Sequence, residues 1–190
     1  MQLTFANKVT IGRILIVPFF IATVLYYLPE RDYFRYVALS LFLFAVVSDV
    51  IDGYIARTRH QKTKAGAILD PLADKLLLIS AFICLMIKSE YFGRVQFPLW
   101  LVVAVISRDV ILLLGAMLIY IIHGKLNITP SRWGKLNTFF QVSCVVGIFL
   151  QWEISPVIWY VTVVLTTISC LGYIRDGIKV LNTPSVKNTI

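Results

Sequence analysis

Six apolar runs of about 20 residues follow one another along the chain, separated by short polar stretches. In hydrocarbon, backbone N–H and C=O groups have to pair within their own segment, so runs of this length fold as helices. The pattern therefore predicts an all-α membrane protein with six transmembrane helices. The expected spans are residues 8–28, 33–58, 66–88, 97–123, 133–152 and 155–181.

The two ends of the chain differ from these runs. Met1–Ala6 mixes apolar and polar residues ahead of the first run, which is typical of a short interfacial segment. The first run is too long for the apolar region of a signal peptide and no A-x-A cleavage site follows it, so we expect it to be a span. We predict a single domain over residues 1–182 and a polar tail over residues 183–190.

Composition supports the bilayer as the surrounding medium. Hydrophobic residues make up 58% of the 190 residues and charged residues 15%, whereas a soluble domain has about 45–50% and 25%. The net charge of +8 would suggest nucleic acid in a soluble protein. Here it favours anionic lipid headgroups as partners, and we expect no nucleic acid. The three cysteines lie in apolar runs without CxxC spacing, which predicts neither disulfides nor a zinc site.

Lysine and arginine residues near the predicted helix ends are divided unequally between the two sides of the membrane. Because the side richer in these residues is cytoplasmic, both termini and the 57–64 loop are predicted in the cytoplasm, in a multi-pass protein of the cytoplasmic membrane. The richer side has Lys8, Arg13, Arg57, Arg59, Lys62, Lys64, Lys125, Arg132, Lys135, Arg175, Lys179 and Lys187, against Arg31, Arg35, Lys88 and Arg94.

Four aspartates lie inside two of the predicted spans. Asp49 and Asp52, three residues apart, are near the end of the second span, and Asp70 and Asp74, four apart, are near the start of the third. Ionisable residues are costly in a membrane and are functional candidates there. Spacings of three and four place each pair on one helix face. We therefore expect the short connecting loop to bring the two pairs together at the cytoplasmic face.

Four carboxylates in a region of low dielectric constant need compensating positive charge. Oxygen ligands with no His or Cys nearby favour Mg²⁺ or Mn²⁺ over zinc, and such ions commonly bind phosphoryl groups. Small residues would let a ligand approach this site, and Arg57 and Thr63 could bind its phosphate. Taken by itself, Arg57 is also consistent with an ordinary interfacial arginine whose side chain extends to the membrane surface. The small residues are Gly53, Ala56 and Gly66.

Taken together, these residues read Asp49-x2-Asp52-Gly53-x2-Ala56-Arg57-x8-Gly66-x3-Asp70-x3-Asp74. The pattern resembles the signature of the CDP-alcohol phosphotransferase family, with every fixed position present. The resemblance implies six helices with both termini cytoplasmic, a homodimer, and two divalent ions, Mg²⁺ or Mn²⁺, bridging the pyrophosphate of a CDP-linked lipid. Asp49, Asp52, Asp70 and Asp74 would be the metal ligands.

The resemblance also implies a reaction and further site residues. An alcohol would attack the β-phosphorus of CDP-diacylglycerol and release CMP, with Asp74 as the base that takes the hydroxyl proton. The residues expected to bind the CDP-lipid, besides Asp49 and Asp52, are Gly53, Ala56, Arg57, Thr63, Gly66, Asn7 and Thr10.

The segment Leu69–Lys75 resembles one branch of that family, the phosphatidylglycerophosphate synthases and the eukaryote-type cardiolipin synthases. Two cations that are common in phosphatidylglycerophosphate synthases are absent here, because Met117 and Asn137 stand at their expected positions. In this respect the chain is more similar to the cardiolipin synthases. We predict glycerol 3-phosphate as the acceptor, with phosphatidylglycerol as the alternative. The expected acceptor-binding residues are Arg108, Arg132, Lys135 and Asn137.

Two functions of other classes are alternatives. An ion-coupled transporter would distribute polar groups through the membrane depth, whereas the four aspartates all lie near one face and the first, fifth and sixth spans have almost no charge in their middles. A structural membrane scaffold would tolerate loss of any one carboxylate and would not depend on divalent ions. The clustering of the aspartates favours the enzyme.

Overall fold

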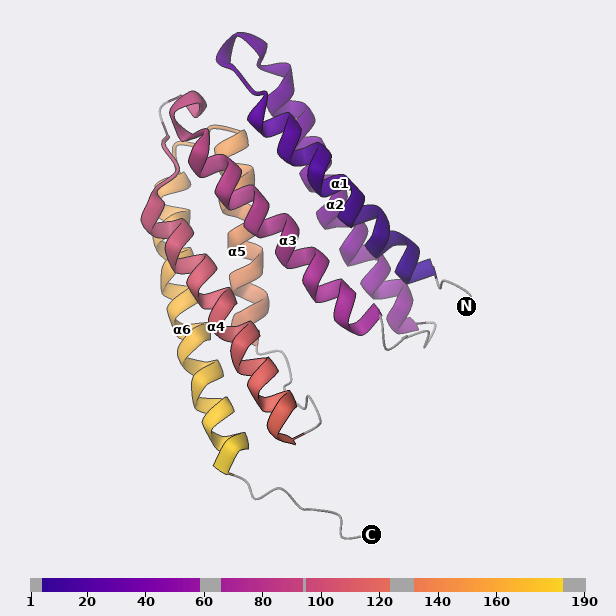
Figure 1. Cartoon of the computed structure of the whole chain (residues 1–190). Coiled ribbons are helices and arrows are strands. Elements are labelled where there is room, and N and C mark those ends of the chain that lie inside the picture. The colour runs from indigo at the N-terminus through magenta and orange to yellow at the C-terminus, as the bar shows by residue number, and fades with distance from the viewer. Residues whose placement is uncertain (1–4, 59–65, 94, 124–131, 183–190) are drawn as a thin grey trace. The chain divides into compact units, whose positions relative to one another are not determined.

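The computed structural model describes residues 5–58, 66–93, 95–123 and 132–182, and all regular elements in these ranges are helical (Figure 1). The prediction of an all-α chain with six long helices is confirmed. The α-helices are α1 (Phe5–Leu25), α2 (Tyr33–Thr58), α3 (Gly66–Ile87), α4 (Leu99–His123), α5 (Arg132–Phe149) and α6 (Ser155–Asn182). The short 3-10 helices are η1 (Pro29–Arg31) and η2 (Ser89–Phe92).

The helix ends differ from the predicted ones by a few residues, for local reasons. The segment predicted to be separate at the N-terminus is partly in α1, which already includes Phe5 and Ala6; residues 1–4 and the polar tail 183–190 lie outside the described residues. α5 ends at Phe149 rather than at residue 152, because Gln151 has a left-handed φ of 53°. There the Trp152 N–H donates to the Gly147 carbonyl over 2.9 Å, which closes the helix as in a Schellman motif.

Two helical segments among the described residues are long and apolar enough to cross a membrane, Tyr33–Ile51 in α2 and Ser155–Gly177 in α6. Shorter apolar segments are Ile11–Leu25 in α1 and Lys75–Ile87 in α3. The six helices are thus observed, while six membrane crossings and the side of the termini stay predictions.

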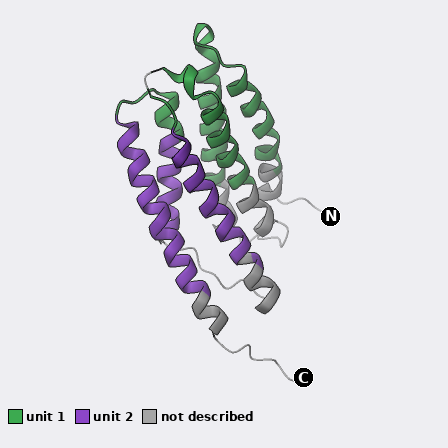
Figure 2. Cartoon of the chain, turned by 60° about the vertical axis from the view of Figure 1, so that its left-hand side comes forward, with its two compact units in different colours: residues 1–97, 145–153 green, residues 98–144, 154–190 purple. Residues whose placement is uncertain are grey.

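The chain forms two compact units (Figure 2), and the prediction of one domain stays a prediction. Unit 1 contains residues 1–97 and 145–153. In it α1 packs along both α2 and α3, which contact each other much less. The start of α1, the end of α2 and the start of α3 lie at the same end of this unit (Figure 1). Its core includes the fully buried rings of Phe20, Phe42 and Phe149. The ring centroid of Phe20 lies 5.8 Å from that of Phe42 and 6.2 Å from that of Phe149.

Unit 2 contains residues 98–144 and 154–190. α4 packs along α6, and the two approach closely at Gly115, where an added Cβ would lie 2.9 Å from Cε1 of Tyr173. The first part of α5 is joined to α6 by polar contacts, among them Cys144 Sγ and Thr162 Oγ1 at 3.1 Å. α6 therefore connects to both other helices of this unit.

The close approach at Gly115 predicts a stability difference between two glycines. Gly115→Ala should destabilise the protein, because the new methyl group would displace the Tyr173 ring. Gly172→Ala, the matched control on α6, has nothing within 4 Å of its Cβ position and should be neutral or stabilise by up to about 1 kcal/mol through helix propensity. SDS titration of the detergent-solubilised variants measures both. Equal stability of the two variants would contradict the close α4–α6 packing.

Candidate functional site

The structure places both aspartate pairs on helices, as predicted. Positions 49 and 52 fall in the last turns of α2, and positions 70 and 74 in the first turns of α3. The side chain of Asp49 is described, and those of Asp52, Asp70 and Asp74 lie outside the described set. These helix ends meet at one end of unit 1, where α1 begins (Figure 1).

Asp49 is held by an arginine from the neighbouring helix. Nη2 of Arg13, on α1, lies 2.6 Å from Oδ1 of Asp49. The Arg13 side chain is 2% exposed and that of Asp49 is 34% exposed. The arginine is thus enclosed by protein while the carboxylate opens to the surroundings. Because a buried charge needs a charged or hydrogen-bonded partner, this pair holds α1 against α2 at the aspartate end.

Arg13 pairs with a predicted site residue, and the sequence analysis did not assign it to the site. It appeared there only as a cytoplasmic positive charge. The available signal was its position, because a basic residue inside an apolar run needs an acidic partner. The second run contains two acidic residues, Asp49 and Asp52, and Asp49 is the one that pairs with Arg13.

The donor chemistry of the aspartates suits a hard divalent ion. Carboxylate oxygens are the ligands that Mg²⁺ and Mn²⁺ prefer, and Asp49 is accessible enough to bind one. Among the described side chains no three His, Cys, Asp or Glu residues come together as a metal site. The two-ion site formed by all four aspartates therefore stays a prediction.

The other residues predicted to bind the CDP-lipid lie on or near the same helices. Asn7 and Thr10 are in the first turns of α1, and the remaining ones are at the end of α2 or the start of α3. Their side chains are outside the described set, and Thr63 lies wholly outside the described residues. Those in α2 are Gly53, Ala56 and Arg57, and Gly66 begins α3.

A second polar cluster lies in unit 2. Arg108, on α4, donates from Nη1 to Oδ1 of Asp109 and from Nη2 to Oγ of Ser169 on α6, each over 2.7 Å. All three residues are buried, with exposed fractions of 6% or less. Arg108 is therefore fixed by a carboxylate and by a hydroxyl group.

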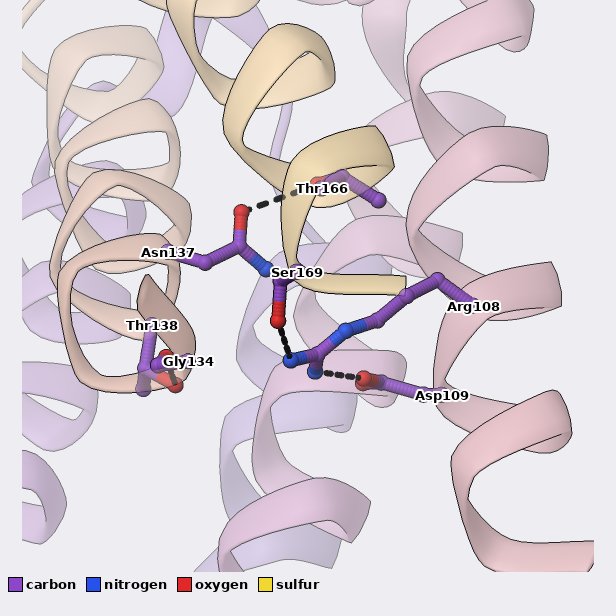
Figure 3. A network of polar contacts seen from close by, with 7 residues as sticks. All are labelled: Arg108, Asp109, Gly134, Asn137, Thr138, Thr166 and Ser169. Atoms are coloured by element: carbon purple, nitrogen blue, oxygen red, sulfur yellow. Dashed lines mark hydrogen bonds and ion pairs between the residues drawn. The ribbon is translucent and has the colours of Figure 1, made fainter. Parts of the chain in front are cut away.

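Asn137, on α5, is hydrogen-bonded to the same face of α6. Oγ1 of Thr166 donates to Oδ1 of Asn137 over 2.9 Å, and Nδ2 of this buried amide has no partner among the described residues. Figure 3 shows the side chains of Arg108, Asn137, Thr166 and Ser169 directed toward one another from α4, α5 and α6. Two of the predicted acceptor-binding residues are thus brought together through α6. Of the other two, Lys135 is exposed on α5, and Arg132 begins α5 with its side chain outside the described set.

The sequence analysis missed Thr166 and Ser169. Their signal was a row of polar residues in an otherwise apolar run, at positions 162, 166, 169 and 173. Spacings of four, three and four place them on one helix face. Gln141, one turn along α5 from Asn137, is also fully buried, and neither polar atom of its amide has a partner among the described residues.

The chain is similar to a known protein family and to individual members of it. The sequence profile of the CDP-alcohol phosphatidyltransferase family matches residues 3–168, which include all four aspartates and the segment from Arg108 to Asn137. The match covers parts of both units, ending one residue before Ser169.

Individual relatives are similar over most of the chain. The CDP-diacylglycerol–glycerol-3-phosphate 3-phosphatidyltransferase of Haemophilus influenzae is 30% identical over 87% of this chain and 89% of its own length. A probable phosphatidylglycerophosphate synthase of Mycobacterium tuberculosis is 29% identical over 92% and 81%. A probable CMP-forming cardiolipin synthase of Drosophila melanogaster is 29% identical over 92% of this chain and 58% of its own length.

The Arg13–Asp49 pair predicts a measurable coupling. In a double-mutant cycle of Arg13→Gln and Asp49→Asn, performed in EDTA, we expect a coupling free energy of about 1–2 kcal/mol, below the roughly 1.5–3 kcal/mol of a buried charged hydrogen bond. The partial exposure of Asp49 reduces it. SDS titration in detergent micelles measures the free energy of unfolding. The control cycle combines Asp49→Asn with Arg31→Gln, because Arg31 is exposed. Additive effects of Arg13→Gln and Asp49→Asn on the free energy of unfolding would rule out the coupling.

Proposed function

The chain belongs to the CDP-alcohol phosphatidyltransferase family, and on that premise we propose that it transfers the phosphatidyl group of CDP-diacylglycerol to glycerol 3-phosphate. The products are phosphatidylglycerophosphate and CMP. The observation that supports this function most is the placement of the four-aspartate signature at the facing ends of α2 and α3, with Asp49 held by the buried Arg13.

The proposed step is a direct displacement at phosphorus. The acceptor hydroxyl oxygen forms a bond to the β-phosphorus of the donor, the bond from that phosphorus to the CMP oxygen breaks, and CMP leaves with the bonding electrons. The hydroxyl proton passes to Asp74. Two divalent ions held by Asp49, Asp52, Asp70 and Asp74 would neutralise the charge that develops on the pyrophosphate.

The residues of the chain contribute mainly by positioning. Arg13 fixes one carboxylate oxygen of Asp49, so this side chain needs little rearrangement to bind an ion. Arg57 and Thr63 would bind the donor phosphates, with room for them beside Gly53, Ala56 and Gly66. Asn7 and Thr10 complete this donor site from α1.

The acceptor site is proposed around Arg108 and Asn137, with Lys135 and Arg132 as further cations. Glycerol 3-phosphate as acceptor is supported by the names of the relatives from Haemophilus influenzae and Mycobacterium tuberculosis. The same chemistry with phosphatidylglycerol as acceptor, giving cardiolipin, is the second candidate. It is favoured by the Arg108–Asp109 ion pair, which offsets one positive charge, and by the neutral amide of Asn137.

The reaction would take place at the cytoplasmic face of the cell membrane. The distribution of Lys and Arg and the long apolar segments of α2 and α6 support six spans with both termini in the cytoplasm. Both the donor and the product are lipids, so a site at the membrane surface would let them enter and leave laterally. The homodimer remains a prediction from the family resemblance.

Asp74→Asn should lower CMP release from CDP-diacylglycerol by roughly 10²–10⁴-fold, the contribution of a general base, while divalent-ion binding is partly kept by the other aspartates. Release of labelled CMP in mixed micelles with glycerol 3-phosphate and Mg²⁺ measures the loss. The exposed Asp176 on α6, replaced by Asn, is the matched control and should keep activity.

Divalent-ion dependence separates the enzyme from the alternatives of other classes. EDTA should abolish CMP release, and added Mg²⁺ or Mn²⁺ should restore it. Unchanged CMP release in Asp74→Asn or in EDTA would overturn the proposed roles of Asp74 and of the divalent ions, whereas absence of CMP release from wild-type protein would leave the scaffold or the transporter.

The acceptor is tested with purified wild-type protein and labelled CDP-diacylglycerol. Among glycerol 3-phosphate, phosphatidylglycerol, inositol phosphate and serine, we expect glycerol 3-phosphate to give the fastest CMP release and a phosphatidylglycerophosphate product. Thin-layer chromatography of the lipid products identifies the acceptor independently. Cardiolipin as the main product would instead establish the second candidate.

A further inference from the structure

The guanidinium group of Arg108 is held at two of its nitrogen atoms and not at the third. Nη1 is paired with Asp109 and Nη2 with Ser169, each over 2.7 Å. Nε is buried and has no partner in the part of the chain that the structure describes. A guanidinium carries five N–H groups in a planar fork, so donors remain available after these two bonds.

The two partners act differently on Arg108. Asp109 is adjacent on the same helix and offsets the positive charge, which a buried arginine needs. Ser169 is on α6, 61 positions away in the chain, and adds no charge. Its hydroxyl therefore does not contribute to neutralisation; it determines where the fork points and connects α4 to α6.

Planar guanidinium groups bind phosphate through two parallel N–H donors, so binding depends strongly on the orientation of the fork. Both candidate acceptors carry a phosphate group, a monoester in glycerol 3-phosphate and a diester in phosphatidylglycerol. A hydroxyl that fixes the orientation of Arg108 would thus favour binding of either one.

We propose that Ser169 is a positioning residue of the acceptor site, which orients the guanidinium of Arg108 toward the phosphate group of the acceptor. The inference rests on the proposed function, because it takes Arg108 as the acceptor-binding cation. It adds a residue of α6 beyond the segment that the family profile matches.

The experiment compares Ser169→Ala and Ser169→Thr with wild type in mixed micelles, varying acceptor and donor separately. Ser169→Ala should raise the KM for glycerol 3-phosphate roughly tenfold, equivalent to about 1.4 kcal/mol, with kcat and the KM for CDP-diacylglycerol within about twofold of wild type. Ser169→Thr keeps the hydroxyl and should restore the acceptor KM to within about threefold.

Thr167→Ala is the matched control. Thr167 is also a hydroxyl residue of α6, but it is exposed and donates to the Val163 carbonyl of its own helix over 2.9 Å. Its substitution should change neither KM. The unchanged donor KM of Ser169→Ala serves as an internal check that this variant is folded.

Three results would overturn the inference. These are an unchanged acceptor KM in Ser169→Ala, an equal rise in both KM values, and a Thr variant that behaves like the Ala variant. The first would mean that Ser169 does not act on the acceptor. The second would indicate a purely structural role, and the third would show that its hydroxyl is not what matters.

Failure of the proposed acceptor is distinguishable from failure of this inference. If wild-type protein uses phosphatidylglycerol instead of glycerol 3-phosphate, the proposed acceptor is wrong, and the same KM comparison is made with phosphatidylglycerol, where the selective rise is again expected. A wild-type preference for an acceptor without a phosphate group would overturn the role of Ser169 as well.

Discussion

The pairing of buried arginine with carboxylate is the constraint on which the polar sites of this protein depend. An unpaired guanidinium surrounded by apolar helices is too costly to persist, so the side chains of Arg13 and Arg108 are ordered by the acids beside them. In unit 1 the pair joins two helices, because Arg13 is on α1 and Asp49 on α2. In unit 2 the pair lies within α4, and the serine on α6 makes the connection between helices.

This difference suits the roles proposed for the two clusters. Asp49 is one-third exposed and remains able to bind a cation, whereas Asp109 is buried and compensates a cation that the protein itself supplies. The aspartate cluster is accordingly proposed to bind metal ions and the pyrophosphate of the donor. The arginine cluster, with the amide of Asn137, is proposed to bind the polar part of the acceptor, and Ser169 is proposed to orient Arg108. Similar residue types thus serve opposite purposes because their exposure differs.

Helices were the most predictable feature, and their ends the least. α2 has the predicted bounds, since polar residues flank its apolar run on both sides. α5 ends three residues early because the chain turns through the left-handed conformation of Gln151, a non-glycine residue that gives no sequence signal for such a turn. The aspartate signature could be recognised because its members are close in sequence. Ser169 could not be connected with Arg108 in this way, because 61 residues separate them.

The helical class, the number of long helices, the positions of the four aspartates and the family all follow from the sequence. Each of these depends on local hydrophobicity or on residue spacing along one or two neighbouring helices. The packing of the helices was needed to show which acid neutralises which arginine, and that hydroxyls of α6 face Arg108 and Asn137. Those contacts depend on how helices distant in sequence are rotated against one another, and many alternative pairings satisfy the same pattern of apolar and polar residues.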